Sequence, residues 1–162
     1  MSSRHFLSLI AATTLALAAI PVGAAEHAHD AHDTAKPTLD SGQKWQTDAP
    51  LRQGMANIQS ALQPQRHAIH ANKLQPAAYQ ALAKQTRTQI AFIVDNCRLA
   101  PAADEQLHLI IADLGAAADA MADKDTASAQ RQGARQLLHA LETYGEFFDH
   151  PGLTAPAAKP RH

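Results

Sequence analysis

The sequence is poor in the residues that catalytic sites and covalent cross-links require. Cys97 is the only cysteine, so no internal disulfide can form. Aromatic residues make up 4% of the chain and β-branched runs are missing, which disfavours a β-rich fold. The sequence also has no Gly-rich phosphate loop, no nucleophile elbow and no His-Glu-x-x-His motif. We therefore expect no enzymatic activity.

The sequence also has no large excess of positive or negative charge. The formal net charge is −1 at pH 7, which argues against nucleic acid or an anionic membrane surface as a partner. A helix needs about 20 mostly apolar residues to cross a bilayer, and no segment is that long, so we expect no membrane insertion.

The first 25 residues have the pattern of a secretory leader. Arg4 supplies a positive start, Phe6 to Ile20 form an apolar run, and small residues follow. Residues 1–25 are therefore predicted to be a signal peptide. We expect the mature protein to be exported and, in a Gram-negative host, periplasmic.

From Pro50 onward the sequence is rich in Ala, Gln and Leu, and apolar residues recur at helical spacing. The four apolar stripes are Leu51, Met55, Ile58 and Leu62; then Tyr79, Leu82, Thr86, Ile90, Ile93 and Cys97; then Leu107, Ile111, Leu114, Ala118 and Met121; and finally Ala134, Leu137 or Leu138, Leu141, Tyr144 and Phe148. Each stripe predicts one amphipathic helix.

Proline and polar residues mark the predicted helix ends. Thr47 or Asp48 can cap the first helix, and Pro76 and Pro101 fit the starts of the second and third. Pro64 either kinks the first helix or begins a new short one, and the sequence does not separate these alternatives.

Four helices of about 20 residues joined by short connections predict an all-α fold, an up-down-up-down antiparallel four-helix bundle over residues 47–150. Residues 26–46 show no periodicity and are predicted to form a flexible, disordered tail that contains His and Asp. Residues 151–162 are predicted to be a disordered end. Trp45 is expected to fold back onto the end of the bundle.

The tail carries the most specific chemical signal. It reads "EHAHDAHD", in which three histidines are interleaved with two aspartates: His27, His29, His32, Asp30 and Asp33. Neutral imidazole is a good ligand for copper and zinc, and carboxylates add oxygen donors. The alternative is a soluble spacer without a function. The flexible residues after Asp33 give the tail enough reach to share an ion with His150 at the bundle end, and Cys97 is a further possible ligand there.

Other histidines offer weaker alternatives. His67 and His70 stand at i and i+3 on one helical face, at the bundle end opposite the tail, where a solvated helix end is the simpler interpretation. Ile69 between them should face the core.

A third group of candidate ligands appears when the heights of residues along the predicted helices are compared. Met55, His108, His139 and Cys97 are expected at similar or neighbouring heights and would make a soft site for Cu(I) or haem. Because His108 and His139 should lie at helix flanks, structural roles are favoured for all four. Cys97 is expected at a core position.

The region from about Asp48 to His150 resembles soluble four-helix periplasmic cytochromes b. The resemblance rests on a Met early in the first helix ("LRQGMANI", Met55), short loops and an aromatic end to the last helix ("QLLHALETYGEFF"). It implies a haem with Met55 as one axial ligand and a His as the other. Gly145 stands at the second ligand's position here, so we do not expect haem.

Two further stretches, "KWQTDAPLRQGM" and "FFDHPG", are similar to segments of small exported proteobacterial helical proteins. That resemblance implies the same fold and compartment and no particular activity.

These observations lead to one functional expectation and one alternative. The protein is expected to be an exported, non-enzymatic helical bundle that binds or buffers a transition metal such as copper or zinc through its tail. The alternative is a metal-free bundle that binds an envelope protein, and a haem carrier is a third, less favoured interpretation.

Overall fold

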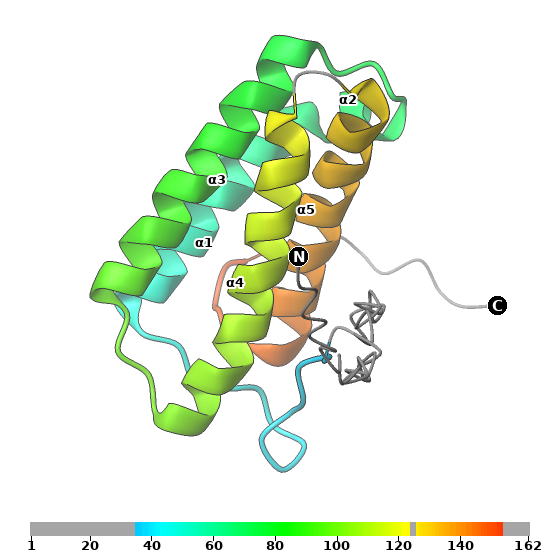
Figure 1. Ribbon diagram of the computed structural model, residues 1–162. Coiled ribbons are helices and arrows are strands. Elements are labelled where there is room, and N and C mark those ends of the chain that lie inside the picture. Colours follow the sequence, from blue (N-terminus) through cyan, green and yellow to red (C-terminus); the bar gives the residue numbers. More distant parts are fainter. Residues whose placement is uncertain (1–34, 124–125, 154–162) are drawn as a thin grey trace, which may run out of the picture. The chain divides into compact units, whose positions relative to one another are not determined.

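The structure is a computed structural model that describes residues 35–123 and 126–153. These residues form the helices α1 (Ala49–Leu62), α2 (Arg66–His70), α3 (Pro76–Asn96), α4 (Pro101–Ala122) and α5 (Ala127–Phe147), with a 3-10 turn, η1 (Gln63–Gln65), before α2 (Figure 1). The described part contains isolated bridges but no strand. The predicted all-α class is confirmed. None of the described helices is both long and apolar enough to cross a membrane.

The helices begin where the sequence places their start signals. Asp48 is the N-cap of α1, and its Oδ1 accepts a hydrogen bond from the Leu51 amide at 2.9 Å. Pro50 is the second residue of α1, and Pro76 and Pro101 are the first residues of α3 and α4; in the first turn a missing N–H costs no intrahelical hydrogen bond.

Both alternatives at Pro64 are partly realised. The chain keeps right-handed helical angles through η1 and then forms the short, separate helix α2. This helix ends at His70; Asn72, two residues later, has a φ of 56°, and the Lys73 amide donates back to the Ala68 carbonyl at 2.8 Å. The exposed fraction of Ile69 is 2%, so α2 continues the buried stripe of α1 as expected.

Contacts between residues of neighbouring helices show the relative direction of these helices. Between α1 and α3, Asn57 Nδ2 donates to Gln89 Oε1 at 2.9 Å, and Gly54 lies against Ile93. Residue numbers therefore rise along α1 as they fall along α3, and these two helices are antiparallel.

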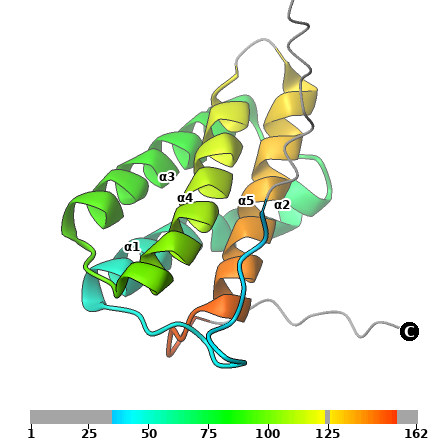
Figure 2. The ribbon, with the colours of Figure 1, turned by 60° about the horizontal axis from the view of Figure 1, so that its bottom comes forward.

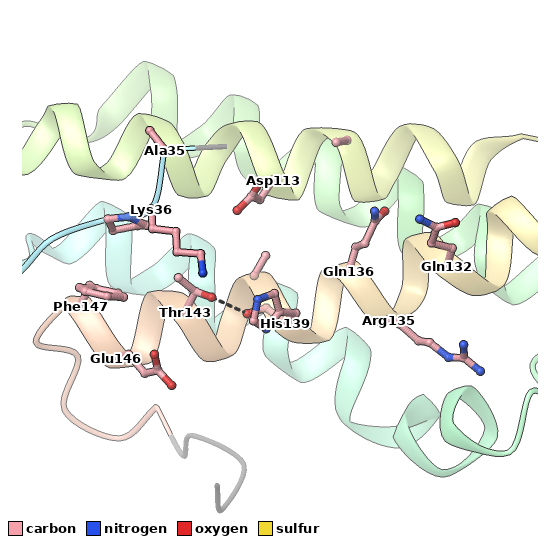
Figure 3. A pocket seen from close by; sticks show the side chains of 13 residues that line it. Ala35, Lys36, Asp113, Gln132, Arg135, Gln136, His139, Thr143, Glu146 and Phe147 are labelled. Carbon is pink, nitrogen blue, oxygen red and sulfur yellow. Dashed lines mark hydrogen bonds between the residues drawn. The ribbon is translucent and has the colours of Figure 1, made fainter. Parts of the chain in front are cut away.

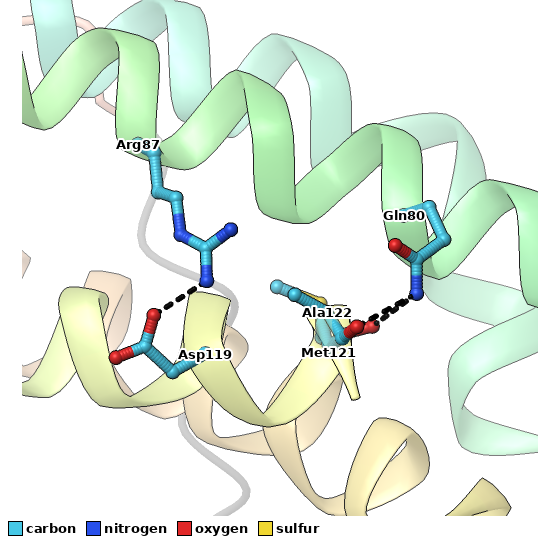
Figure 4. Close-up of polar contacts among 5 residues, drawn as sticks. All are labelled: Gln80, Arg87, Asp119, Met121 and Ala122. Atoms are coloured by element: carbon cyan, nitrogen blue, oxygen red, sulfur yellow. Dashed lines mark hydrogen bonds and ion pairs between the residues drawn. The ribbon is translucent and has the colours of Figure 1, made fainter. Parts of the chain in front are cut away.

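The contacts between α3 and α4 follow the same order (Figure 4). Arg87 Nη2 lies 2.6 Å from Asp119 Oδ1, and Gln80 Nε2 donates to the carbonyls of Met121 and Ala122 at 3.2 Å. The Gln80 amide thus satisfies two of the orphan carbonyls at the end of α4. Helix α5 packs most extensively on α4 (Figure 2).

The core follows the predicted stripes with a shift on two helices. Every member of the first and last stripes is at most 6% exposed. On α3 and α4, however, Ile90 and Ile111 are only half-buried, whereas their neighbours Gln89 and Ile110 are buried. These two middle helices each contact a helix on either side, so the buried face is wider than a single stripe and includes the adjacent position.

Residues 35–48, the N-terminal segment, lie against the helices. Asp40 to Gln43 form a tight turn with positive φ at Ser41 and Gly42, and the Asp40 and Gln43 backbones exchange two hydrogen bonds. The Trp45 amide donates to the Phe147 carbonyl and its own carbonyl accepts from Asp149, both at 2.8 Å. The expectation that Trp45 folds back onto the end of the helices is confirmed.

The close packing of α5 on α4 gives a test of the fold. A Cβ at Gly133 would lie 2.7 Å from the Ala117 carbonyl oxygen and 2.8 Å from the Met121 amide nitrogen, so the two backbones would have to separate. We expect Gly133→Ala to lower the free energy of unfolding by about 1–3 kcal/mol in denaturant titration.

Gly115 on α4 is the matched control, because a Cβ there would meet nothing within 4 Å. Gly115→Ala should leave the stability unchanged or raise it by up to about 1 kcal/mol through helix propensity. Equal effects of the two substitutions would contradict the close approach of α4 and α5.

Candidate functional site

The tail residues with the strongest metal signal lie outside the described residues. These are His27, His29, His32, Asp30 and Asp33, together with the predicted signal peptide over 1–25. Within the described ranges, no group of three or more His, Cys, Asp or Glu side chains is arranged to hold a metal ion. The remaining candidates can be placed one by one.

His150 lies beyond the end of α5 and is held by Tyr144. The Tyr144 hydroxyl and His150 Nδ1 share a hydrogen bond of 3.0 Å, and the two rings meet edge to face at 5.7 Å. Burial and the positive charge of Arg52 lower the pKa of His150, against the opposing effect of Asp149. The lowered pKa favours the neutral ring, whose Nδ1 is engaged by the Tyr144 hydroxyl.

Cys97 lies next to Asp48 at the end of α3. Its thiol donates a hydrogen bond to the Asp48 carboxylate, which also accepts the backbone amide of Arg98 at 2.6 Å. The thiol is half-buried rather than fully buried, because Cys97 is the C-cap of α3 and not one of its interior residues. Burial, and then the negative charge of Asp48, raise the pKa of Cys97 to about 12.

His108 shares a pocket with Cys97. This pocket has a volume of about 270 Å³ and lies between the end of α3 and the first turns of α4. Its apolar walls include Ile93, Leu107 and the exposed Val94. The sequence grouped Cys97 and His108 with Met55 and His139 as a candidate soft site, although it favoured structural roles for all four, and the structure brings Cys97 and His108 together in one pocket.

His139 lies on a different face and lines a larger groove of about 600 Å³ between α4, α5 and the first residues of the N-terminal segment (Figure 3). Asp113 from α4 and Lys36 from the N-terminal segment reach into the same groove. The His139 side chain is 80% exposed, and its Nδ1 lies 4.0 Å from Glu142 Oε2. The structure therefore separates His139 from His108.

The other histidine candidates are placed as the sequence predicts. His67 and His70 are exposed on α2, on either side of the buried Ile69.

Met55 is completely buried in the core, so it does not join His108 and His139 at the surface. Gly145, at the position expected for a second haem ligand, is half-buried, and its carbonyl accepts a hydrogen bond from Lys44 Nζ at 2.6 Å.

Comparison with known proteins found no matching family model, no significantly similar curated protein and no significantly similar solved structure.

The raised pKa of Cys97 predicts slow thiol chemistry. At pH 8 the folded protein should hold far less thiolate than an unfolded chain, whose Cys pKa is near 9.0. We expect alkylation of native Cys97 by iodoacetamide to be at least about 100-fold slower than alkylation in denaturant. Equal rates in the two states would show that the thiol is neither desolvated nor paired with Asp48.

The lowered pKa of His150 predicts an acid-sensitive contribution to stability. As the pH falls through the unfolded value of 6.5, the unfolded chain binds the proton first, so the free energy of unfolding decreases towards the lower pKa of the folded state. Denaturant titrations between pH 7.5 and 5, in the presence of a chelator, should show this loss in the wild type and not in His150→Asn.

Tyr144→Phe is the comparison for that experiment. It removes the hydroxyl that contacts His150 but leaves burial and Arg52, the two causes of the lowered pKa. The variant should keep the wild-type pH dependence. If the stability of His150→Asn depended on pH as the wild type does, the loss of stability in acid would come from other groups.

Proposed function

We propose that this protein is an exported, non-enzymatic metal-binding protein, in which an up-down-up-down antiparallel four-helix bundle carries a histidine-rich tail. The proposal rests on one observation, the sequence "HAHDAHD" directly after a leader-like segment. Its three imidazoles and two carboxylates are the donors that copper and zinc accept. In this proposal the ligands are His27, His29, His32, Asp30 and Asp33, and the compartment is the periplasm.

His150 is a further candidate ligand in the proposal. Its position supports only one mode of binding, through Nε2, because Nδ1 is engaged by Tyr144. A neutral imidazole is the form that binds metals, and the lowered pKa of His150 favours that form. Binding through Nε2 uses the tautomer in which Nδ1 carries the proton and donates to the Tyr144 oxygen.

The tail is best tested by substitution in the full mature chain. Truncation at Asp40 would also remove Thr38, whose amide donates to Gln106 Oε1 at 2.8 Å and whose carbonyl accepts the Trp45 indole. We expect His27→Ala/His29→Ala/His32→Ala to weaken Cu(II) or Zn(II) binding at least about tenfold in titration calorimetry, because each ion loses direct ligands.

The exposed pair on α2 provides the control. His67→Ala/His70→Ala removes two imidazoles, and both side chains are exposed. This variant should keep the wild-type affinity and lose less than about 1 kcal/mol of stability. Unchanged affinity in the triple tail variant would refute the proposed function.

A metal-free interaction protein is the second candidate. The observation that favours it is the exposure of two large apolar side chains on α3, Phe92 at 37% and Val94 at 62%. Under this alternative a protein partner binds equally well with and without a chelator, and the purified chain gives no binding heat with micromolar copper or zinc.

A further inference from the structure

We propose that Cys97 and His108 form a second metal site, separate from the tail, that takes a soft monovalent cation, Cu(I), between the Cys97 sulfur and His108 Nε2. Both residues line the pocket of about 270 Å³ between α3 and α4. The site uses residues of the helical body alone, so it does not depend on the proposed function of the tail.

The orientation of His108 supports this assignment. His108 Nδ1 lies 2.8 Å from the Asp104 carbonyl oxygen, one turn earlier on α4, and 3.5 Å from the Asp104 carboxylate. A carbonyl oxygen can only accept, so Nδ1 carries the proton and the lone pair of the neutral ring is on Nε2. Metal-binding histidines usually have this arrangement, in which a backbone carbonyl or carboxylate fixes the other nitrogen.

The environment of Cys97 supplies the second donor. The proton of the thiol points to the Asp48 carboxylate, which accepts it in a hydrogen bond. When Cu(I) binds, the S–H bond breaks, an S–Cu bond forms and one proton leaves to solvent. No electron is transferred. The copper-thiolate unit is neutral, so binding replaces a hydrogen-bonded thiol without leaving an uncompensated negative charge beside Asp48.

The donor set selects the ion. Thiolate sulfur is a soft ligand that favours Cu(I), and imidazole also binds copper. Cu(I) is satisfied by two such donors, whereas structural zinc takes four. The apolar side chains Ile93, Leu107 and Val94 line the pocket together with the charged Arg98 and Asp104.

Competition with a chromophoric Cu(I) chelator, without oxygen and with a reductant, tests the site. The chain should carry His27→Ala/His29→Ala/His32→Ala, so that only the helical body binds copper. We expect one Cu(I) per chain and an affinity that rises about tenfold per pH unit between about pH 7.5 and 8.5, above the ordinary pKa of imidazole, because binding then releases only the thiol proton.

Two substitutions then separate the site from its surroundings. Cys97→Ser should lower the Cu(I) affinity at least about 100-fold, since hydroxyl oxygen is a hard donor. His108→Ala should lower it at least about tenfold. Because the His108 side chain is 72% exposed, this variant keeps the fold, and circular dichroism verifies this for both variants.

His139→Ala is the matched control, since that histidine is 80% exposed on α5 and lies in the other groove. It should leave Cu(I) binding unchanged. Equal losses in His108→Ala and His139→Ala, or full affinity in Cys97→Ser, would overturn the site. Neither result would bear on the tail, whose binding is measured with Cu(II) or Zn(II) in the chain that has its own histidines.

Discussion

The carboxylate of Asp48 accepts hydrogen bonds from three donors and joins the start of α1 to the end of α3. Its Oδ1 accepts the Leu51 amide in the first turn of α1, and its Oδ2 accepts the Arg98 amide after α3. The Cys97 thiol is a third donor. Burial alone would raise the pKa of Asp48, but the hydrogen bonds from Arg98 and Leu51 outweigh it and lower the pKa. The start of α1 is thereby fixed against the end of α3 by a charged acceptor, whose hydrogen bonds are stronger than neutral ones.

This constraint determines where the next elements lie. With Cys97 and Arg98 held at Asp48, the chain has only two residues left before Pro101 begins α4, so the first turns of α4 must lie beside the end of α3. The Arg98 guanidinium adds a local cap by donating to the carbonyls of Asp95 and Cys97. The pocket that contains Cys97 and His108 is a consequence of this short connection. On the other side of Asp48, Thr47 Oγ1 donates to the Asp149 carbonyl at 2.6 Å and ties α1 to the end of α5.

The sequence predicts the fold class well because helix signals are local. The stripe of Leu51, Met55, Ile58 and Leu62 and the prolines at the helix starts act over one or two turns, and the structure matches them. The sequence does not predict which residues are buried where burial depends on the packing of several helices. Gln89 and Ile110 are buried for this reason, although neither belongs to a predicted stripe. The second oxygen of Asp48 could not be assigned at all, since its partner, Arg98, lies 50 residues away in the sequence. For the tail, in contrast, the prediction of a metal site rests entirely on its histidines and aspartates.

His108 and His139 show why a histidine's exposure does not determine its chemistry. Both side chains are largely exposed on helices, and the sequence gives them the same flanking role. The difference is one hydrogen bond and one neighbour. His108 Nδ1 is fixed by the Asp104 carbonyl and its pocket is also lined by Cys97, whereas His139 Nδ1 lies 4.0 Å from the Glu142 carboxylate and no cysteine lines its groove. A ring with a fixed tautomer loses less orientational freedom on binding a metal. A fixed tautomer and a neighbouring thiol, and not exposure, distinguish His108 from His139.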